Sequence, residues 1–505
     1  MNINLNSLGC VEGALADGVY QFLGLPYAEA VTNERRFLPP IPKRPWRGVL
    51  VADHFGAICS QKMMPGLFEW VSPDPATAGQ DCLNLNVWTP DPKGSLPVMV
   101  WIHGGAFYSG SGGEDVYEGI EFAKSGVVCV TINYRLGAQG FLDLSAFGGD
   151  YESSGCVGIM DQVCALEWVR DHIAQFVGDP NRVTIAGESA GGMSVSTLMA
   201  TPSAKGLFQQ AIVQSGAANN TLSKELSGII TRELFSKLGI HEPPDLDAIS
   251  DGVLLEAQVE LMTEIEESQD EERFGLMVGN PMPFQPVHGC PFLPDPPIVA
   301  ISKGSAKAVA LLQGITRHEA PIFSFHEMAD FLTDELAWLS CVPIVHASGL
   351  DEGSIRKYYL GRDGHPLTKA GALVSDFMFA IPTLEMLNAQ TQNNPNTWAY
   401  RFDWENPGFN GLLQAHHFIE IPFVFNTLAT TSAKKFGINQ APKSLADVTH
   451  KAWVAFITHG DPNHPELSDW QRWQGPNSRH CMTFNENCQM DTLVDDRTLS
   501  VWGLH

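Results

Sequence analysis

The stretch that decides the fold is Gly187-Glu188-Ser189-Ala190-Gly191-Gly192, which follows the apolar run 182–186. It predicts a strand, a sharp turn that carries one serine, and a helix over residues 193–200. Hydrolases with a serine nucleophile need this arrangement, because the turn lifts the hydroxyl into a cleft and the flanking glycines admit a cramped backbone. The first N–H groups of the helix, including that of Ala190, point toward whatever the serine attacks. The motif alone is weakly specific, so its partners must be found elsewhere in the chain.

A glycine-rich turn earlier in the chain is the first candidate partner. Residues 97–102 (PVMVWI) form a short, β-rich apolar run, and His103-Gly104-Gly105-Ala106-Phe107 follows it directly. Glycines here let backbone N–H groups point inward without a blocking Cβ, as an anionic tetrahedral intermediate requires. Taken alone, an ordinary turn after a strand explains the pattern equally well. Together with the serine turn it predicts an oxyanion hole made by the N–H groups of Gly105, Ala106 and Ala190.

A serine nucleophile also needs a base and an acid that orients the base, and both follow the serine in this chain order. Residues 308–313 (AVALLQ) predict a buried strand, and Glu319 follows where its carboxyl end meets the catalytic edge of a parallel sheet. With 57 acidic residues in the chain, a solvated loop carboxylate remains an alternative reading of Glu319. His416 and His417 lie further on, and their spacing does not decide which one is the base.

Several ordered motifs make the chain resemble type B carboxylesterases, the carboxylesterase and cholinesterase family, in its bacterial para-nitrobenzyl-esterase-like form. They span 22–28 (FLGLPYA), 81–87 (DCLNLNV), 133–137 (NYRLG) and the region 453–463, in addition to the two turns above. The resemblance runs essentially from end to end. It implies an α/β-hydrolase fold, with a mostly parallel central β-sheet flanked by helices and with helical insertions that form an active-site gorge.

The resemblance also implies the roles of individual residues. Ser189 matches the family's nucleophile and Glu319 matches its acid. His417 matches the base, because Glu420 and Ile421 stand third and fourth after it, as the family pattern requires. The implied reaction is carboxylic ester hydrolysis through an acyl-enzyme, on esters with short to medium acyl chains. No metal or organic cofactor is expected.

Two other classes of function remain as alternatives. The same triad serves lipases, aryl- or hydroxycinnamoyl esterases, amidases, carbamate hydrolases and polyester hydrolases, and the sequence does not separate these. A non-catalytic adhesion or scaffold protein is the remote alternative. It is disfavoured because the serine, the acid, the base and the glycine-rich turn are all present.

By resemblance, the segment between Cys59 and Cys82 lies over the active-site gorge, and these two cysteines match a pair that forms a disulfide in secreted relatives. The segment's apolar side chains either anchor a long loop or form a lid that accepts acyl or alcohol chains. They are Met63, Met64, Leu67, Phe68 and Trp70. Motif position adds Phe107, Phe284 and Phe323 as pocket candidates.

The chain also departs from the family pattern at two informative positions. Phe418 stands where a glycine usually follows the base, which is expected to narrow or reshape the mouth of the site. Gln80 replaces the acidic residue usual before Asp81, so Arg36 is expected to lose an ion pair and to keep at best a neutral hydrogen bond.

Composition limits the classes of partner. The 505-residue chain has a net charge of −26, which disfavours nucleic acid and anionic membrane surfaces as partners. The triad candidates lie at 189, 319 and 417, so we expect one domain over residues 1–505, with insertions near 220–280 and 325–395. The expected partner is a small-molecule ester, and the expected assembly is a monomer or a small homo-oligomer.

The sequence also predicts where the protein is located in the cell. No basic residue precedes Arg35, and we find no apolar run long enough for a signal peptide or a membrane span. We therefore expect no membrane anchor and a cytoplasmic protein, or a secreted one if a leader has been removed.

Overall fold

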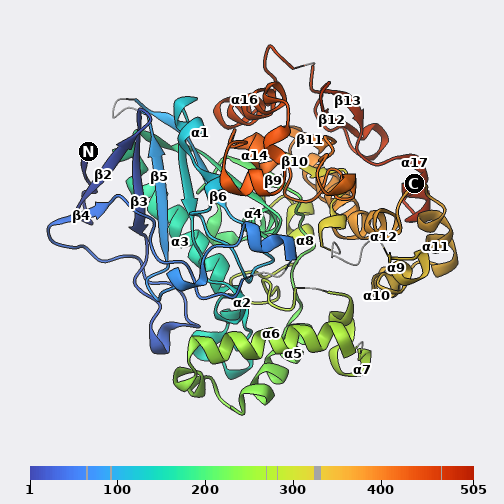
Figure 1. Cartoon of the computed structure of the whole chain (residues 1–505). Helices are drawn as coiled ribbons and strands as arrows, with labels where there is room; N and C mark the ends of the chain where they lie inside the picture. Colours follow the sequence, from blue (N-terminus) through green and yellow to red (C-terminus); the bar gives the residue numbers. More distant parts are fainter. Residues whose placement is uncertain are drawn as a thin grey trace.

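A computed structural model describes residues 1–63, 66–90, 94–268, 270–280, 282–323, 331–467 and 469–504. Its thirteen strands form one sheet (Figure 1). The strands are β1 (Asn2–Asn4), β2 (Cys10–Ala16), β3 (Val19–Pro26), β4 (Val49–Ala52), β5 (Asn84–Thr89), β6 (Leu96–Ile102), β7 (Val128–Ile132), β8 (Gly178–Glu188), β9 (Gln210–Gln214), β10 (Ala310–Thr316), β11 (Thr397–Phe402), β12 (His480–Phe484) and β13 (Gln489–Thr492).

The middle of the sheet is parallel. The strand order is β1-β2-β3-β5-β7-β6-β8-β9-β10-β11-β12-β13, with β4 beside β2. Every neighbouring pair from β7 to β12 is parallel, whereas β1, β2, β3 and β5 on one side and β13 on the other pair antiparallel along this order. The predicted, mostly parallel central sheet is therefore confirmed. Its parallel strands bring their carboxyl ends to one edge, where such folds carry their sites.

Helices cover both faces of this sheet. They are α1 (Ile120–Lys124), α2 (Gly137–Phe141), α3 (Val157–His172), α4 (Ala190–Ala200), α5 (Lys224–Leu238), α6 (Asp251–Ser268), α7 (Glu271–Phe274), α8 (Pro297–Ser302), α9 (Asp334–Leu339), α10 (Val342–Ser348), α11 (Glu352–Leu360), α12 (Pro366–Ser375), α13 (Ile381–Thr391), α14 (Ile421–Val424), α15 (Thr431–Lys435), α16 (Lys443–His459) and α17 (Asp496–Val501).

The alternation of side chains along β6 shows how the layers form. Val98, Val100 and Ile102 belong to a core cluster that includes residues of α3 and α4. Met99 and Trp101 belong to a second cluster that includes residues of α14 and α16. Successive side chains of a strand point to opposite faces, so each cluster fills the space between one face of the sheet and its helices.

The two predicted insertions are helical. The first contains α5 and α6, and the second contains α9 to α13; in Figure 1, α5, α6 and α9 to α11 lie away from the centre of the sheet. Within the second, α12, a π-helical turn (Asp376–Ala380) and α13 make one continuous helix, Pro366–Thr391. Contrary to the sequence-based expectation, this helix is long and apolar enough to span a membrane by length and composition. However, 67% of its most apolar window is buried inside the protein, as is usual for a core helix.

Arg36 has an ion-pair partner that the sequence analysis did not identify. Gln80 removes only the ion pair expected at its own position, and Arg36 pairs with another carboxylate instead. Arg36 Nη1 lies 2.8 Å from Asp251 Oδ1, at the first residue of α6. Asp251 also accepts hydrogen bonds from Ser60 Oγ at 2.8 Å and Gln139 Nε2 at 2.7 Å. The first insertion thus supplies the acid from a distant part of the chain and ties α6 to the N-terminal region.

Candidate active site

Ser189 lies in the sharp turn between β8 and α4, as the sequence predicts. Its backbone has φ 56° and ψ −126°, a strained conformation for a residue other than glycine. The neighbouring glycines are required by close backbone approach: a Cβ on Gly191 would lie 2.0 Å from the carbonyl oxygen of Ile102. The turn leaves Ser189 partly exposed at a cavity of about 60 Å³ that His417 also lines.

Glu319 and His417 are brought together from separate strand ends. Glu319 follows β10 and is fully buried, and its Oε2 lies 2.6 Å from His417 Nδ1. Its other oxygen, Oε1, accepts hydrogen bonds from Ser215 Oγ at 2.7 Å and from the Thr316 N–H at 2.8 Å. The carboxylate is therefore held in one orientation. The sequence analysis missed Ser215, although its place directly after β9, beside β10, is the same strand-end signal that pointed to Glu319.

His416 has a different environment from its neighbour. Its Nδ1 lies 2.6 Å from the carbonyl oxygen of His417, and its Nε2 lies 3.4 Å from Asn406 Nδ2. Burial lowers the pKa of His416 to about 4, so its ring is neutral near pH 7. Of the two adjacent histidines, His417 is the one that faces both the acid and the cavity.

Glu188, the residue before the serine, is a site residue that the sequence analysis missed. Its Oε1 lies 3.0 Å from His417 Nε2, and both side chains are 3% exposed. Burial of the imidazole opposes its protonation, but attraction to Glu188 and Glu319 outweighs burial and raises the pKa of His417 to about 10. The ring is therefore held between two carboxylates and favours the protonated form.

The glycine-rich turn after β6 also faces the cavity. Gly105 has φ 107° and Ala106 has φ 52°, and a Cβ on Gly105 would lie 2.1 Å from the carbonyl oxygen of Ser109. In the described part of the chain, the N–H groups of Gly105 and Ala106 donate no hydrogen bond. Both residues line the cavity beside Ser189. Ala190 begins α4, where an N–H has no partner within its own helix.

The predicted pocket residues divide into two groups. Phe68 and Phe323 line the cavity, with ring centroids 5.6 Å apart, and Phe323 lies 5.1 Å from the ring of His417. Phe107, Phe284 and Met63 do not line it. Phe107 is fully buried against Phe141, Phe284 is buried in the core, and Met63 is 47% exposed to solvent.

The other predicted residues of the segment between Cys59 and Cys82 give less information about the pocket. Leu67 is partly buried against the core cluster that includes α14 and α16. Met64 and the side chain of Trp70 lie outside the described residues. Cys59 and Cys82 are buried, and their sulfur atoms lie 2.6 Å apart without a bond between them, so the disulfide stays a prediction.

Three further residues complete the cavity wall. Phe418 has φ 73°, a conformation that explains why glycine is usual at this position, and its ring lines the cavity. Glu114 and Tyr117 line it as well, and burial raises the pKa of the Glu114 carboxyl well above its ordinary value. The cavity is therefore small, and aromatic rings and carboxyl groups form part of its wall.

Comparison with known proteins agrees with this geometry. The profile of the carboxylesterase family matches residues 2–502. The chain is 37% identical to the para-nitrobenzyl esterase of Bacillus subtilis over 478 residues, which cover 92% of this chain and 90% of that protein. It is 34% identical to the phenmedipham hydrolase of Pseudarthrobacter oxydans over 501 residues, which cover 95% of each.

A solved structure leads to the same family. The carboxylesterase EST55 of Geobacillus stearothermophilus superposes with a TM-score of 0.84 at 32% identity, over 99% of both chains. The fold is therefore that of the α/β-hydrolases. The chain belongs to the carboxylesterase family and is a serine carboxylic ester hydrolase.

Proposed function

We propose that Ser189, His417 and Glu319 form the catalytic triad of an esterase that acts on short to medium acyl esters. The observation that carries the proposal is the convergence of the turn after β8, the segment after β10 and the loop after β11 that holds His417. Ser189 on its strained turn and His417, which contacts Glu319 at 2.6 Å, line one cavity. The order serine, acid, histidine along the chain is the order used by this fold.

In the proposed reaction, Ser189 Oγ attacks the ester carbonyl while Nε2 of His417, in its neutral form, accepts the hydroxyl proton. Glu319 keeps the proton of Nδ1 in place and stabilises the imidazolium that forms. His417 then gives its proton to the departing alcohol, and a water molecule repeats both steps on the acyl-enzyme. In the free protein Nε2 faces Glu188 at 3.0 Å. We therefore infer that the ring edge turns toward Ser189 when substrate fills the cavity, since catalytic hydrogen bonds often form fully only in the bound state.

In this proposal, backbone N–H groups stabilise the negative charge of the tetrahedral intermediate. The proposed donors are the N–H groups of Gly105, Ala106 and Ala190. The strained loop fixes the first two, and the start of α4 fixes the third. Removal of one such donor typically raises the barrier by about 3 kcal/mol.

The dimensions of the cavity support a preference for short acyl chains. Its volume is about 60 Å³, and Phe68, Phe323 and Phe418 form part of its wall. A long acyl chain requires these rings to move apart, whereas an acetyl or butyryl group requires less displacement. Lipase or polyester hydrolase activity would demand a wider opening.

The first test is hydrolysis of p-nitrophenyl esters from acetyl to palmitoyl. We expect kcat/KM to be highest between acetyl and butyryl and to fall by at least about tenfold at palmitoyl, equivalent to about 1.4 kcal/mol of barrier. A maximum at long chains would identify a lipase instead. An inert protein that an organophosphonate still labels at Ser189 would have another ester as substrate, whereas an inert and unlabelled protein would contradict the proposed triad.

Replacement of Glu188 by glutamine is expected to change the pH dependence of the reaction. The substitution removes a negative charge 3.0 Å from His417 Nε2, so the imidazolium is less stable and the pKa of His417 falls. The neutral, basic form then persists to lower pH. The acidic limb of the kcat/KM profile for p-nitrophenyl butyrate should therefore move to lower pH by about one to three units.

The matched control is Glu260→Gln, which removes a carboxylate from an exposed position on α6. It should leave the profile unchanged. An unmoved or upward-shifted acidic limb in the Glu188 variant would show that Glu188 does not set the protonation of His417.

A further inference from the structure

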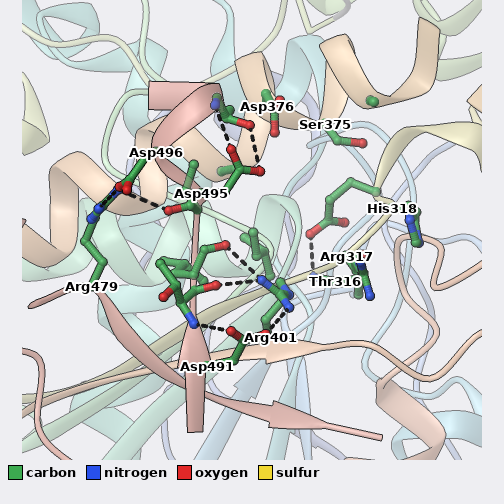
Figure 2. A pocket seen from close by; sticks show the side chains of 18 of the residues that line it. Thr316, Arg317, His318, Ser375, Asp376, Arg401, Arg479, Asp491, Asp495 and Asp496 are labelled. Carbon is green, nitrogen blue, oxygen red and sulfur yellow. Dashed lines mark hydrogen bonds and ion pairs between the residues drawn. The ribbon is translucent and has the colours of Figure 1, made fainter. Parts of the chain in front are cut away.

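A second and larger cavity, of about 620 Å³, adjoins Glu319 but not Ser189 or His417 (Figure 2). In Figure 2, Arg317 and His318 lie on one side, Arg479 with Asp495 and Asp496 lies on the other, and Arg401 lies between them. The cavity volume is in the range of small-molecule sites, which are typically about 300–1,000 Å³.

Four arginines line this cavity, and one of them forms no ion pair with a described carboxylate. Arg401 pairs with Asp403 and Asp491, Arg479 pairs with Asp496, and Arg317 lies 3.6 Å from Asp403. The guanidinium of Arg362, in contrast, donates to Tyr358 Oη at 3.0 Å and lies over the rings of Tyr358 and Tyr359. In the part of the chain that the structure describes, it forms no ion pair.

The acidic residues of the lining are already engaged, and Glu319 contacts His417 Nδ1 at 2.6 Å. Asp491 and Asp496 belong to the ion pairs above. Asp495 accepts the N–H of Thr498 at 2.8 Å at the start of α17, and Asp376 accepts the hydroxyl of Tyr359 at 2.6 Å. Among the described residues, Arg362 is thus the lining arginine with no carboxylate in ion-pair contact, although it also feels the charge of Asp376.

Two neutral polar groups of the lining also have no partner in the described part of the chain. Thr316 is fully buried, and its Oγ1 makes no hydrogen bond; His318 Nδ1 makes none either. Burial and then the positive charges of Arg317, Arg401 and Arg362 lower the pKa of His318 to about 3. These three arginines are thus close enough for their charge to act on the His318 ring.

We propose that this cavity binds an organic carboxylate, held by the guanidinium of Arg362 and the hydroxyl of Thr316. A guanidinium presents paired donors that match the two oxygens of a carboxylate. Ile315, Leu493 and Val494 supply apolar wall for the rest of the molecule. An inorganic anion would satisfy the same donors but would leave most of the volume and these apolar side chains unused.

The cavity lies close to the site of ester hydrolysis. The N–H of Thr316 donates to Glu319 Oε1 at 2.8 Å. A ligand bound to the Thr316 side chain would therefore contact a residue that is hydrogen-bonded to the proposed catalytic acid. The π-helical turn Asp376–Ala380 borders the cavity with Asp376 and Ala380, and its Phe379 lies 4.9 Å from the ring of His417. Such π-helical turns often occur at functional sites.

The test is calorimetric titration of the full-length protein with benzoate and with its neutral analogue benzamide. We expect one benzoate to bind per chain and benzamide to bind at least about tenfold more weakly, because only benzoate carries the charge that Arg362 attracts. Arg362→Gln should weaken benzoate binding by at least about tenfold, and Thr316→Val should weaken it by about three- to tenfold. Thr316→Ser, which keeps the hydroxyl, should bind as the wild type does.

The control Arg232→Gln changes an exposed arginine outside this cavity and should have no effect. Melting temperature is measured for each variant, and Thr316→Val and Thr316→Ser keep the test decisive if Arg362→Gln does not fold. Absence of benzoate binding at about 10 mM would overturn the proposal, as would equal binding to wild type and to folded Arg362→Gln. Equal displacement of benzoate by phosphate would identify an unselective anion site and would also overturn it. None of these outcomes depends on the reactivity of Ser189.

Discussion

Replacement of Ser189 by alanine is expected to lower kcat for p-nitrophenyl butyrate by about five to six orders of magnitude. Without Oγ no acyl-enzyme forms, and only the oxyanion donors and substrate binding still accelerate direct attack by water. Stability should change little, because Ser189 Oγ makes no hydrogen bond to the described residues. Steady-state hydrolysis measures the activity, and mass spectrometry of the phosphonate-treated protein measures the labelling.

Ser196→Ala is the matched control. Ser196 lies on the same helix, α4, and its hydroxyl contacts the Gly192 carbonyl oxygen at 3.1 Å and not the cavity. It should keep activity within about twofold of wild type, as expected for a change away from the reacting groups. If Ser189→Ala keeps more than about one part in a hundred of the wild-type rate, another nucleophile carries the reaction.

Glu319→Gln is expected to lower kcat by about four orders of magnitude with a smaller change in KM. The glutamine amide has nearly the same shape as the carboxylate, but it lacks the charge that stabilises the His417 imidazolium. It can also donate to His417 Nδ1 at the 2.6 Å contact and so favour the wrong tautomer. Single-turnover and steady-state kinetics with p-nitrophenyl butyrate separate the chemical step from binding.

Glu385→Gln provides the comparison, because Glu385 is an exposed glutamate on α13 that contacts Asn219. It should hydrolyse the ester at the wild-type rate. A loss of less than about tenfold in Glu319→Gln would mean that His417 does not depend on this carboxylate for its orientation.

Local sequence was sufficient for the elements that present the site. The apolar run, the glycines and the serine at 187–191 predict a strand, a turn and a helix because each depends on residues within a few positions of one another. The structure has β8, Ser189 with φ 56°, and α4 at these positions. The turn at Gly105 was predictable for the same reason, since a Cβ at that position would collide with the carbonyl of Ser109 only four residues away.

Local sequence could not predict which phenylalanine side chains line the cavity. Phe68 and Phe107 both belong to motifs near the site, yet Phe68 lines the cavity and Phe107 packs beneath it against Phe141. The direction of each ring depends on the strained backbone of its loop and on side chains from other elements. Motif position carries neither kind of information.

Sequence alone thus determined the parallel sheet, the serine turn, the glycine-rich turn and the chain order of the reactive groups. Family resemblance had already assigned the base to His417, and the structure shows its contact with Glu319. The tertiary structure alone decided that Glu188 borders the same imidazole and that Ser215 supports the acid. It also supplied Asp251 as the partner of Arg36 and grouped the arginines of the second cavity. The physical reason is range: strand and turn formation depend on neighbouring residues, whereas these contacts join side chains that only the register of the folded sheet brings within hydrogen-bonding distance.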